Sequence, residues 1–350
     1  MTGLADDLMD AFMGASPAGG DRTSYGASTV RRSRRTSAEL EVIDQAIITA
    51  VEEDSPVTLR GVFYRAESAG AVEKTEAGYR LVGRELLKLR RARRVSYADI
   101  TDGTRWITKP DTWTGLDQML NDATASYRRA LWHDQDTEVQ VFTEKDAISG
   151  VILPVTEQWD VPLGVLRGYA SESFSWSVAD SIRAAGRRGK TVWLYQLGDH
   201  DPSGLDAWRS FRERVCGFLG PHTAEIEDAD TLAPGLLYYP FPVGADDSDP
   251  VAYVWFDRLA VTEEQIEEWG LPTRPTKQSD PRSTGFGGGS TEVDAIRAPI
   301  LRQLVEDAIT QHIDPEALAV VRVAEQSERE LLTRMHSDYQ GEIDEIGGES

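Results

Sequence analysis

Apolar residues in the second half of the chain follow two alternating patterns, one with the period of strands and one with the period of helices. The short apolar runs EVQVFT, PLGVLRG and TVWLYQLG are each followed by a longer amphipathic segment. Strands that alternate with helices predict a parallel sheet built from right-handed crossover connections. We therefore expect residues 138–340 to form an α/β domain with a parallel sheet.

The first half of the chain has the helical period instead. An apolar stripe from Leu40 to Val51 predicts a first helix, and further helices are expected over residues 59–69 and 77–93. The runs VSYADI and TRWITK, separated by TDG, predict a two-stranded hairpin. Three helices followed by a small hairpin are typical of a winged-helix DNA-binding domain, which we place at residues 37–110.

The remaining segments carry weaker patterns. Residues 1–36 are rich in Gly, Ser and Ala and are expected to be a disordered tail, and a second tail is expected at 341–350. Residues 111–137 predict a connecting helix between the two domains. Residues 220–249 hold the apolar run LLYYPFPV between two acidic clusters. This insertion fits a surface loop, a hairpin that covers the sheet edge, or an acidic loop that mimics DNA or binds a partner.

Composition narrows the class of protein. The chain has 350 residues, of which 40% are hydrophobic, and this length suits about two domains. Its single cysteine, Cys216, excludes an internal disulfide framework and a cysteine-based zinc site. No stretch approaches the roughly 20 apolar residues of a membrane span, and the start, MTGLADDLMDAF, lacks the pattern of a secretion signal. These features predict a soluble, cytoplasmic protein with no membrane partner.

The chain is acidic as a whole but contains one basic segment. A net charge of -22 argues, taken alone, against a nucleic-acid partner, yet residues 57–109 contain twelve Lys and Arg against six Asp and Glu. This segment therefore has a charge of +6 and the rest of the chain -28. Within the third predicted helix, four cations recur at spacings of four, four and three, so they share one face: Arg80, Arg84, Lys88 and Arg91. We expect this face to bind DNA, although a solvated helix face would show the same spacing.

Carboxylates follow two of the predicted strands. Glu144 comes directly after the first strand, and Asp199 and Asp201 come just after the third. Because parallel strands place their carboxyl ends at one edge of a sheet, we expect these acids to converge there and bind Mg²⁺. Taken singly, each has a structural alternative, since Asp201 could cap the next helix. Lys145 either neutralises a phosphate or is a surface residue at a helix start.

These residues resemble a known family. Glu144 together with GDHDPSG at residues 198–204 is similar to the Toprim domain of topoisomerases, bacterial primases and several nucleases. The Asp-x-Asp-Pro-x-Gly pattern most resembles that of the topoisomerase VI A subunit and its meiotic double-strand-break relative. LRGYAS resembles a Gly-Tyr-Pro-Ser segment of the same group, with Ala170 in place of proline.

A second resemblance lies in the basic segment. TLRGVFYR at residues 58–65 is similar to the active-site helix of that family, in which Arg, an acid, an aliphatic residue, an aromatic residue and the nucleophilic Tyr follow one another. Carried over by position, Tyr64 is the nucleophile, Phe63 is the preceding aromatic residue, and Arg60 is the basic partner of the scissile phosphate. Gly61 stands where the family has an acid.

The resemblance implies a function, a fold and partners. It implies a winged helix followed by a Rossmann-like Toprim domain, as in type IIB topoisomerase A subunits of the small mini-A type. Tyr64, Arg60 and Glu144 would be catalytic, and Glu144, Asp199 and Asp201 would hold Mg²⁺. The implied reaction is double-strand DNA cleavage through a 5′-phosphotyrosyl link, which religation reverses. The implied partners are double-stranded DNA in the nucleoid, a second copy of the chain, and an ATPase B-type subunit that this chain does not contain.

Two other functions fit the same residues. In the first, the Toprim site hydrolyses DNA with water, as Toprim nucleases do, and Tyr64 is a core residue. In the second, the chain is a non-catalytic DNA-binding regulator with a degenerate Toprim domain. The complete set of three acids argues against the regulator.

Overall fold

Structure is described for most of the chain in a computed structural model, at residues 35–100, 110–220, 236–244, 250–275, 286 and 289–348. The chain divides into two units, residues 1–40 and 41–350. In the first unit, the Thr36 hydroxyl accepts a hydrogen bond from the backbone N–H of Glu39 at the start of helix α2 (Ser37–Asp54). The rest of the expected N-terminal tail, residues 1–34, lies outside the described residues.

The three helices expected between residues 37 and 93 are present. Thr58 and Thr75 cap the second and third of them, because each hydroxyl accepts a hydrogen bond from a backbone N–H three residues later. Ile47, Phe63 and Leu86, one from each helix, are at most 3% exposed. The periodic apolar positions therefore predicted the helices correctly. They are α2, α3 (Leu59–Ser68) and α4 (Glu76–Arg91).

The prediction of a hairpin after these helices was wrong for its first strand. Residues 95–100 form turns, and Ile100 makes a single isolated bridge with Val57. The Asp99 carboxylate accepts a hydrogen bond from the Ser96 N–H at 3.1 Å. Side chains that bond nearby backbone groups in this way compete with a strand ladder. The second expected strand, TRWITK, lies outside the described residues.

The second half of the chain forms an α/β fold around a five-stranded sheet of order β2-β1-β3-β5-β4. Four strands run parallel, and β4 pairs antiparallel with β5. The alternation of strands and helices in the sequence correctly predicted the mostly parallel sheet. The strands are β1 (Thr137–Thr143), β2 (Leu163–Val165), β3 (Thr191–Leu197), β4 (Leu237–Pro242) and β5 (Val251–Ala260).

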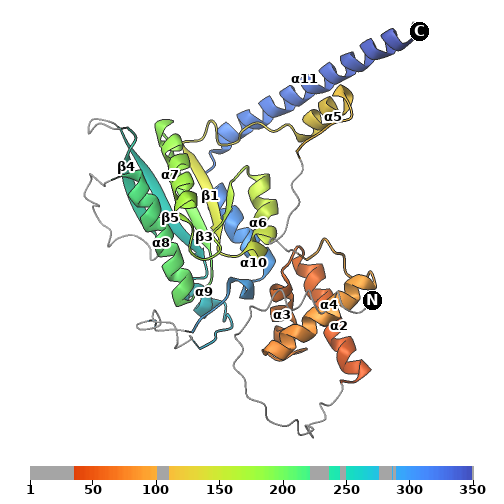
Figure 1. Cartoon of the computed structure of the whole chain (residues 1–350), viewed down its shortest axis with the longest axis vertical. Helices are drawn as coiled ribbons and strands as arrows, with labels where there is room; N and C mark the ends of the chain where they lie inside the picture. The colour runs from red at the N-terminus through yellow and green to blue at the C-terminus, as the bar shows by residue number, and fades with distance from the viewer. Residues whose placement is uncertain are drawn as a thin grey trace, which may run out of the picture. The chain divides into compact units, whose positions relative to one another are not determined.

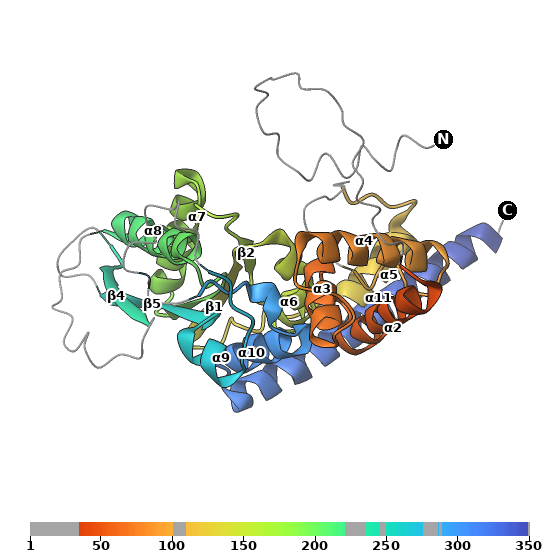
Figure 2. The same cartoon turned by 90° about the horizontal axis from the view of Figure 1, so that it is seen from below.

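Helices cover both faces of this sheet (Figures 1 and 2). On one face, α7 and α8 bury the core that contains Phe211, Leu194 and Phe256. On the other face, α6 and α10 pack against each other and against the strands. These helices are α6 (Asp146–Gln158), α7 (Glu172–Arg187), α8 (Pro202–Leu219) and α10 (Ala298–Thr310).

The apolar part of the expected insertion, residues 220–249, belongs to the sheet. It forms β4, which pairs with β5 from Leu237 opposite Phe256 to Pro242 opposite Val251. Of the three alternatives, this part agrees with a hairpin at the sheet edge. Its acidic flanks, residues 221–235 and 245–249, lie outside the described residues.

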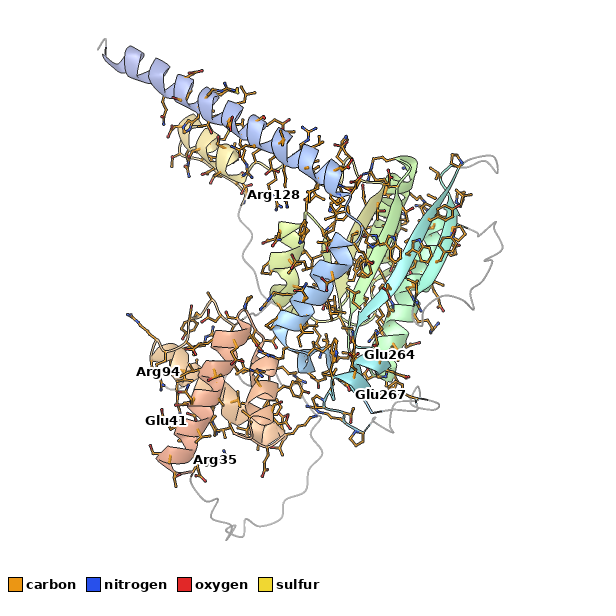
Figure 3. The ribbon with its side chains drawn as sticks, turned by 180° about the vertical axis from the view of Figure 1, so that it is seen from behind. Arg35, Glu41, Arg94, Arg128, Glu264 and Glu267 are labelled. Carbon is orange, nitrogen blue, oxygen red and sulfur yellow. The ribbon has the colours of Figure 1, made fainter. Side chains whose placement is uncertain are left out.

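Two further helices pack together, α5 (Leu116–Ser126) and α11 (Pro315–Gly348). Arg128, just after α5, donates a hydrogen bond to the carbonyl of Gln158 at 2.7 Å and so ties this pair to the end of α6 (Figure 3). The expected tail at 341–350 is helical as far as Gly348, because GEIDEI contains no proline and Glu favours helices. None of the helices in the described ranges is long and apolar enough to cross a membrane.

His312 follows α10 and packs against strand β3. Its ring lies 4.7 Å from the Trp193 ring, and its Nε2 lies 2.6 Å from the Tyr195 hydroxyl. Burial lowers the pKa of His312 to about 4. Since an unfolded histidine titrates near pH 6.5, the neutral ring stabilises the fold fully above that pH. This contribution is lost as the pH falls from 6.5 through 4.

We therefore expect the difference in unfolding free energy between the wild type and His312→Gln to shrink as the pH falls from 7 to 4, measured by urea denaturation. His133→Gln is the control, because the His133 side chain is 72% exposed, and its curve should parallel the wild type. A wild type and a His312→Gln variant with parallel pH curves would contradict the expectation.

Candidate functional site

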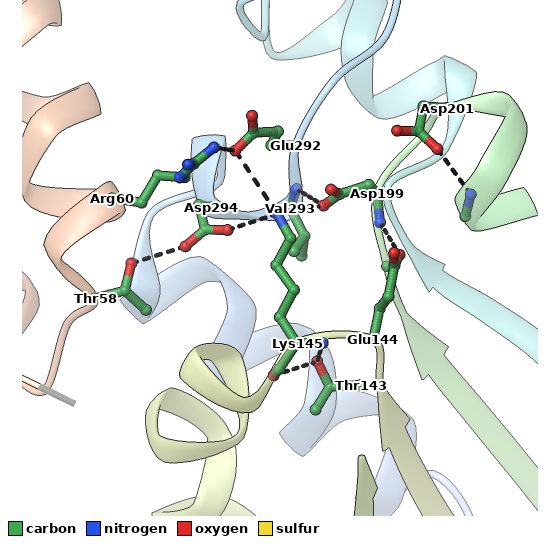
Figure 4. A network of polar contacts seen from close by, with 12 residues as sticks. Thr58, Arg60, Thr143, Glu144, Lys145, Asp199, Asp201, Glu292, Val293 and Asp294 are labelled. Carbon is green, nitrogen blue, oxygen red and sulfur yellow. Dashed lines mark hydrogen bonds and ion pairs between the residues drawn. The ribbon is translucent and has the colours of Figure 1, made fainter. Parts of the chain in front are cut away.

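The predicted acids lie at the carboxyl edge of the sheet (Figure 4). Thr143 of β1 is in register with Leu197 of β3, and the next residue, Glu144, donates its N–H to the Leu197 carbonyl at 3.0 Å. The Glu144 carboxylate in turn accepts a hydrogen bond from the Asp199 N–H at 3.0 Å. Parallel pairing of β1 and β3 thus brings together residues that are far apart in the sequence.

Asp201 approaches the same place from the start of α8. Its Oδ1 accepts the Gly204 N–H at 2.7 Å, so it is the cap of this helix. A Cβ atom on Gly204 would lie 2.6 Å from the Asp199 carbonyl oxygen, 3.0 Å from Glu144 Oε2 and 3.4 Å from Asp201 Oδ1. Only glycine fits at this position, where the start of α8 approaches both carboxylates.

The electrostatics of these acids favour a cation. Burial, followed by repulsion from Asp199, raises the pKa of Glu144. Burial also raises the pKa of Asp199, although Lys145 opposes this effect. A cation placed between these carboxylates would offset both effects.

Lys145 supplies the positive charge present at this edge. Its Nζ lies 2.9 Å from Asp199 Oδ1, 3.0 Å from Asp294 Oδ2 and 3.6 Å from Glu292 Oε2 (Figure 4). Burial alone would lower the pKa of Lys145, but the three carboxylates outweigh burial and raise it. The side chain predicted to face a phosphate thus contacts carboxylates here.

Glu292 and Asp294 were not predicted as site residues. Glu292 precedes and Asp294 lies within a short 3-10 helix, η3 (Val293–Ala295), whose first N–H, that of Val293, donates to Asp199 Oδ1 at 3.0 Å. The alternation of acids in TEVDAI was visible in the sequence. Only the fold shows that this segment returns to the ends of β1 and β3.

Arg258 of β5 was also missed. It is 9% exposed, and its guanidinium donates hydrogen bonds to the carbonyls of Gly198 at 2.9 Å and Asp199 at 2.6 Å. Two further bonds reach Gln196 Oε1 at 2.8 Å and the Val261 carbonyl at 3.1 Å. Burial lowers the pKa of Arg258 to about 10. Arg258 thus fixes the loop that carries Asp199.

Tyr64 lies on α3 and is 5% exposed. Its hydroxyl accepts a hydrogen bond from Arg274 Nη2 at 3.1 Å, and Arg274 Nη1 lies 3.0 Å from Glu292 Oε1. Arg60, one turn before Tyr64, also pairs with Glu292. Burial, followed by the negative charge of Glu292, raises the pKa of Tyr64 to about 12. Tyr64 and Arg60 therefore connect to the acidic edge through Glu292.

The four cations predicted to bind DNA line the solvent side of α4. Each is exposed, whereas Leu81, Leu86 and Leu89 of the same helix are buried. Two of the four pair with acids of their own helix, Arg80 with Glu76 at 3.4 Å and Lys88 with Glu85 at 2.7 Å. The four cations are Arg80, Arg84, Lys88 and Arg91.

The acids fit Mg²⁺ in chemistry but do not form a ligand shell as they stand. Carboxylate oxygens are the ligands that Mg²⁺ prefers, and Glu144 and Asp201 each accept a backbone N–H at this edge of the sheet. Among the described residues, however, no group of three or more His, Cys, Asp or Glu side chains is arranged to hold a metal ion. Asp201 is turned toward the α8 N-terminus, and Asp199 contacts Lys145.

Comparisons of the chain with known protein families, with curated proteins and with solved structures gave no match.

Arg258→Met tests whether this arginine positions the acidic loop. The substitution removes the guanidinium donor of the Asp199 carbonyl and leaves the Gly198 carbonyl with the Val261 N–H alone, so we expect the free energy of unfolding to fall by about 3 kcal/mol. Arg209→Met, at an exposed position of α8, should change stability by less than about 1 kcal/mol. Equal stability of the two variants would refute the role of Arg258.

Proposed function

We propose that this chain cleaves DNA in a Mg²⁺-dependent reaction in which Tyr64 attacks the backbone and forms a 5′-phosphotyrosyl intermediate. The observation that carries the proposal is the path of contacts from the Tyr64 hydroxyl to the acids. It runs through Arg274 and Glu292 to Lys145, and from Lys145 to Asp199 at 2.9 Å. The residues that the family resemblance implies are thus linked within one chain.

The side chains have distinct roles in this proposal. Tyr64 Oη forms a bond to phosphorus, the bond from phosphorus to the 3′ oxygen breaks, and the phenol proton passes through water to that oxygen. Arg60 holds the phosphate beside the phenol, one helical turn away. Mg²⁺ held by Glu144, Asp199 and Asp201 would stabilise negative charge on the phosphate and on the leaving oxygen. Arg258 keeps the Asp199 loop in place.

The resemblance also supports a finer description of the fold and of DNA binding. We propose that the sheet is of the Toprim type, because the acids follow β1 and β3 as in that domain. We propose that α2, α3 and α4 act as a winged-helix element, with the four cations of α4 on DNA phosphates or bases. Because residues 95–100 form no strand, the winged-helix proposal rests on the three helices.

One observation favours a second function, hydrolysis of DNA by water at the same acids. Tyr64 is 5% exposed and burial raises its pKa to about 12. A phenol with this pKa stays protonated near pH 7 and is therefore a weak nucleophile. In a Toprim nuclease, Tyr64 would only pack and hold Arg274.

A covalent-adduct assay separates the two functions. We expect wild-type protein with supercoiled DNA and Mg²⁺, then denatured, to stay attached to 5′ ends, and Tyr64→Phe to form no adduct. Glu144→Gln and Asp199→Asn should lose both adduct and breaks. Tyr97→Phe, at a tyrosine that is 57% exposed, should behave as the wild type. Breaks with free ends that persist in Tyr64→Phe would rule out the covalent mechanism and support hydrolysis.

The implied homodimer and B-type ATPase subunit rest on the resemblance alone. In such a dimer, the tyrosine of one copy serves the acids of the other, in place of the contacts within one chain described above. An equal mixture of Tyr64→Phe and Asp199→Asn chains should then recover part of the adduct, since mixed dimers hold one complete site. Each variant alone should form none. A mixture as inactive as its components would mean that both halves of the site come from one chain.

A further inference from the structure

A second site lies beside Tyr64, in a cavity of about 120 Å³ between α3, the start of α4 and Arg274. Three cationic side chains line it, Arg60, Lys74 and Arg274, together with the phenol of Tyr79. Arg60 lies over the Tyr79 ring at 5.3 Å, and Lys74 Nζ lies 5.6 Å from the centre of the Tyr64 ring. The cavity is therefore polar and positively charged, and two of its cations, Lys74 and Arg274, contact the candidate nucleophile Tyr64.

The three cations are not equally engaged. Arg60 and Arg274 both pair with Glu292. Lys74, in contrast, makes no hydrogen bond or ion pair with any residue whose structure is described. Burial lowers the pKa of Lys74, although Glu67 opposes this effect. Apart from the Tyr64 ring, this partly buried ammonium group thus has no anionic or hydrogen-bonding partner among the described residues, and an anion in the cavity would supply one.

The charge around the cavity suits one phosphodiester. Among the residues that line the cavity, Arg60, Lys74 and Arg274 are cations and Glu76 is the single acid. Glu292 and Glu67 act on these cations from outside the lining, so the lining itself has an excess of positive charge and a backbone phosphodiester has a charge of -1. Guanidinium groups and an ammonium group are the side chains that bind phosphate oxygens most strongly.

We infer that this cavity binds a phosphate of the nucleic-acid backbone and that Lys74 and Arg274 are its new ligands, beside Arg60. The inference rests on the proposed function, since it places the bound phosphate next to the Tyr64 hydroxyl, to which Arg274 already donates. The same chemistry would accept free phosphate, so the source of the phosphate has to be tested separately from its binding.

Binding measurements on the full chain provide the first test. We expect inorganic phosphate to raise the melting temperature of the wild type and of Lys74→Arg, and to have no effect on Lys74→Gln or Arg274→Gln. Arg209→Gln, on the exposed side of α8, should respond as the wild type. An equal response of the wild type and Lys74→Gln, or no response in either, would overturn the inference.

Binding of a 30-base-pair duplex identifies the source of the phosphate. Lys74→Gln should weaken duplex binding about tenfold, equivalent to about 1.4 kcal/mol, and should lower the slope of log affinity against log salt by about one. Lys74→Arg should restore both values. Phosphate binding that depends on Lys74, combined with unchanged duplex affinity and slope, would show a site for free phosphate and overturn the assignment to DNA.

These experiments distinguish failure of the phosphate site from failure of the proposed cleavage mechanism. If the cavity binds phosphate and DNA as expected but no adduct forms, the site stands and the covalent mechanism fails. If the adduct forms and Lys74→Gln changes neither phosphate binding nor the DNA concentration for half-maximal adduct, the mechanism stands and the site fails. With both correct, Lys74→Gln should raise that DNA concentration about tenfold, and saturating DNA should recover most of the adduct.

Discussion

Glu292 and Asp294 hold helix α3 against the carboxyl edge of the sheet. Asp294 accepts a hydrogen bond from Thr58, the cap of α3, at 2.8 Å, and Glu292 pairs with Arg60 of the same helix. Both acids also face Lys145, which follows β1. Because a partly buried carboxylate is stable only when it is paired, the acids of η3 restrict how α3 can lie on the sheet. The position of Tyr64 relative to the acids after β1 and β3 depends on this cluster.

Positive charge is what allows so many acids to share the edge. Arg258 lies below the loop of Asp199 with its donors on backbone carbonyls, and Lys145 lies among Asp199, Glu292 and Asp294. Among the described residues, neither cation makes a hydrogen bond or ion pair with Glu144 or Asp201, whose carboxylates instead accept the N–H groups of Asp199 and Gly204. An added divalent cation would therefore complete the charge balance at the place where the protein's own cations stop. Within the described part of the chain, two of the acids thus lack a cationic partner, although the acids together do not surround a metal position.

Local patterns predicted the elements, whereas contacts between distant segments decided the site. The stripe from Leu40 to Val51 predicted α2, and the run TVWLYQLG predicted β3. Both predictions hold because the spacing of apolar residues reflects which face of the element is buried. Pairing of parallel strands then placed Glu144 beside Asp199, as expected from the sequence. Arg258 and Glu292 could not be recognised in this way, because neither follows a strand of the predicted alternation: Arg258 lies within β5 and Glu292 precedes η3. The failure at residues 95–100 has a local cause, because the Asp99 side chain takes a backbone donor that a strand would have used.

Glu292 also couples the two halves of the site electrostatically. In the described arrangement it neutralises Arg60 and Arg274 on one side and approaches Lys145 on the other. A phosphate in the cavity beside Tyr64 would compete with Glu292 for both guanidinium groups. Each guanidinium that turned from Glu292 to the phosphate would leave more of the Glu292 charge to Lys145 and would weaken the attraction of Lys145 to Asp199. Arrival of a phosphate at Tyr64 would thus release an acid for Mg²⁺, so the anion and the metal would each favour binding of the other.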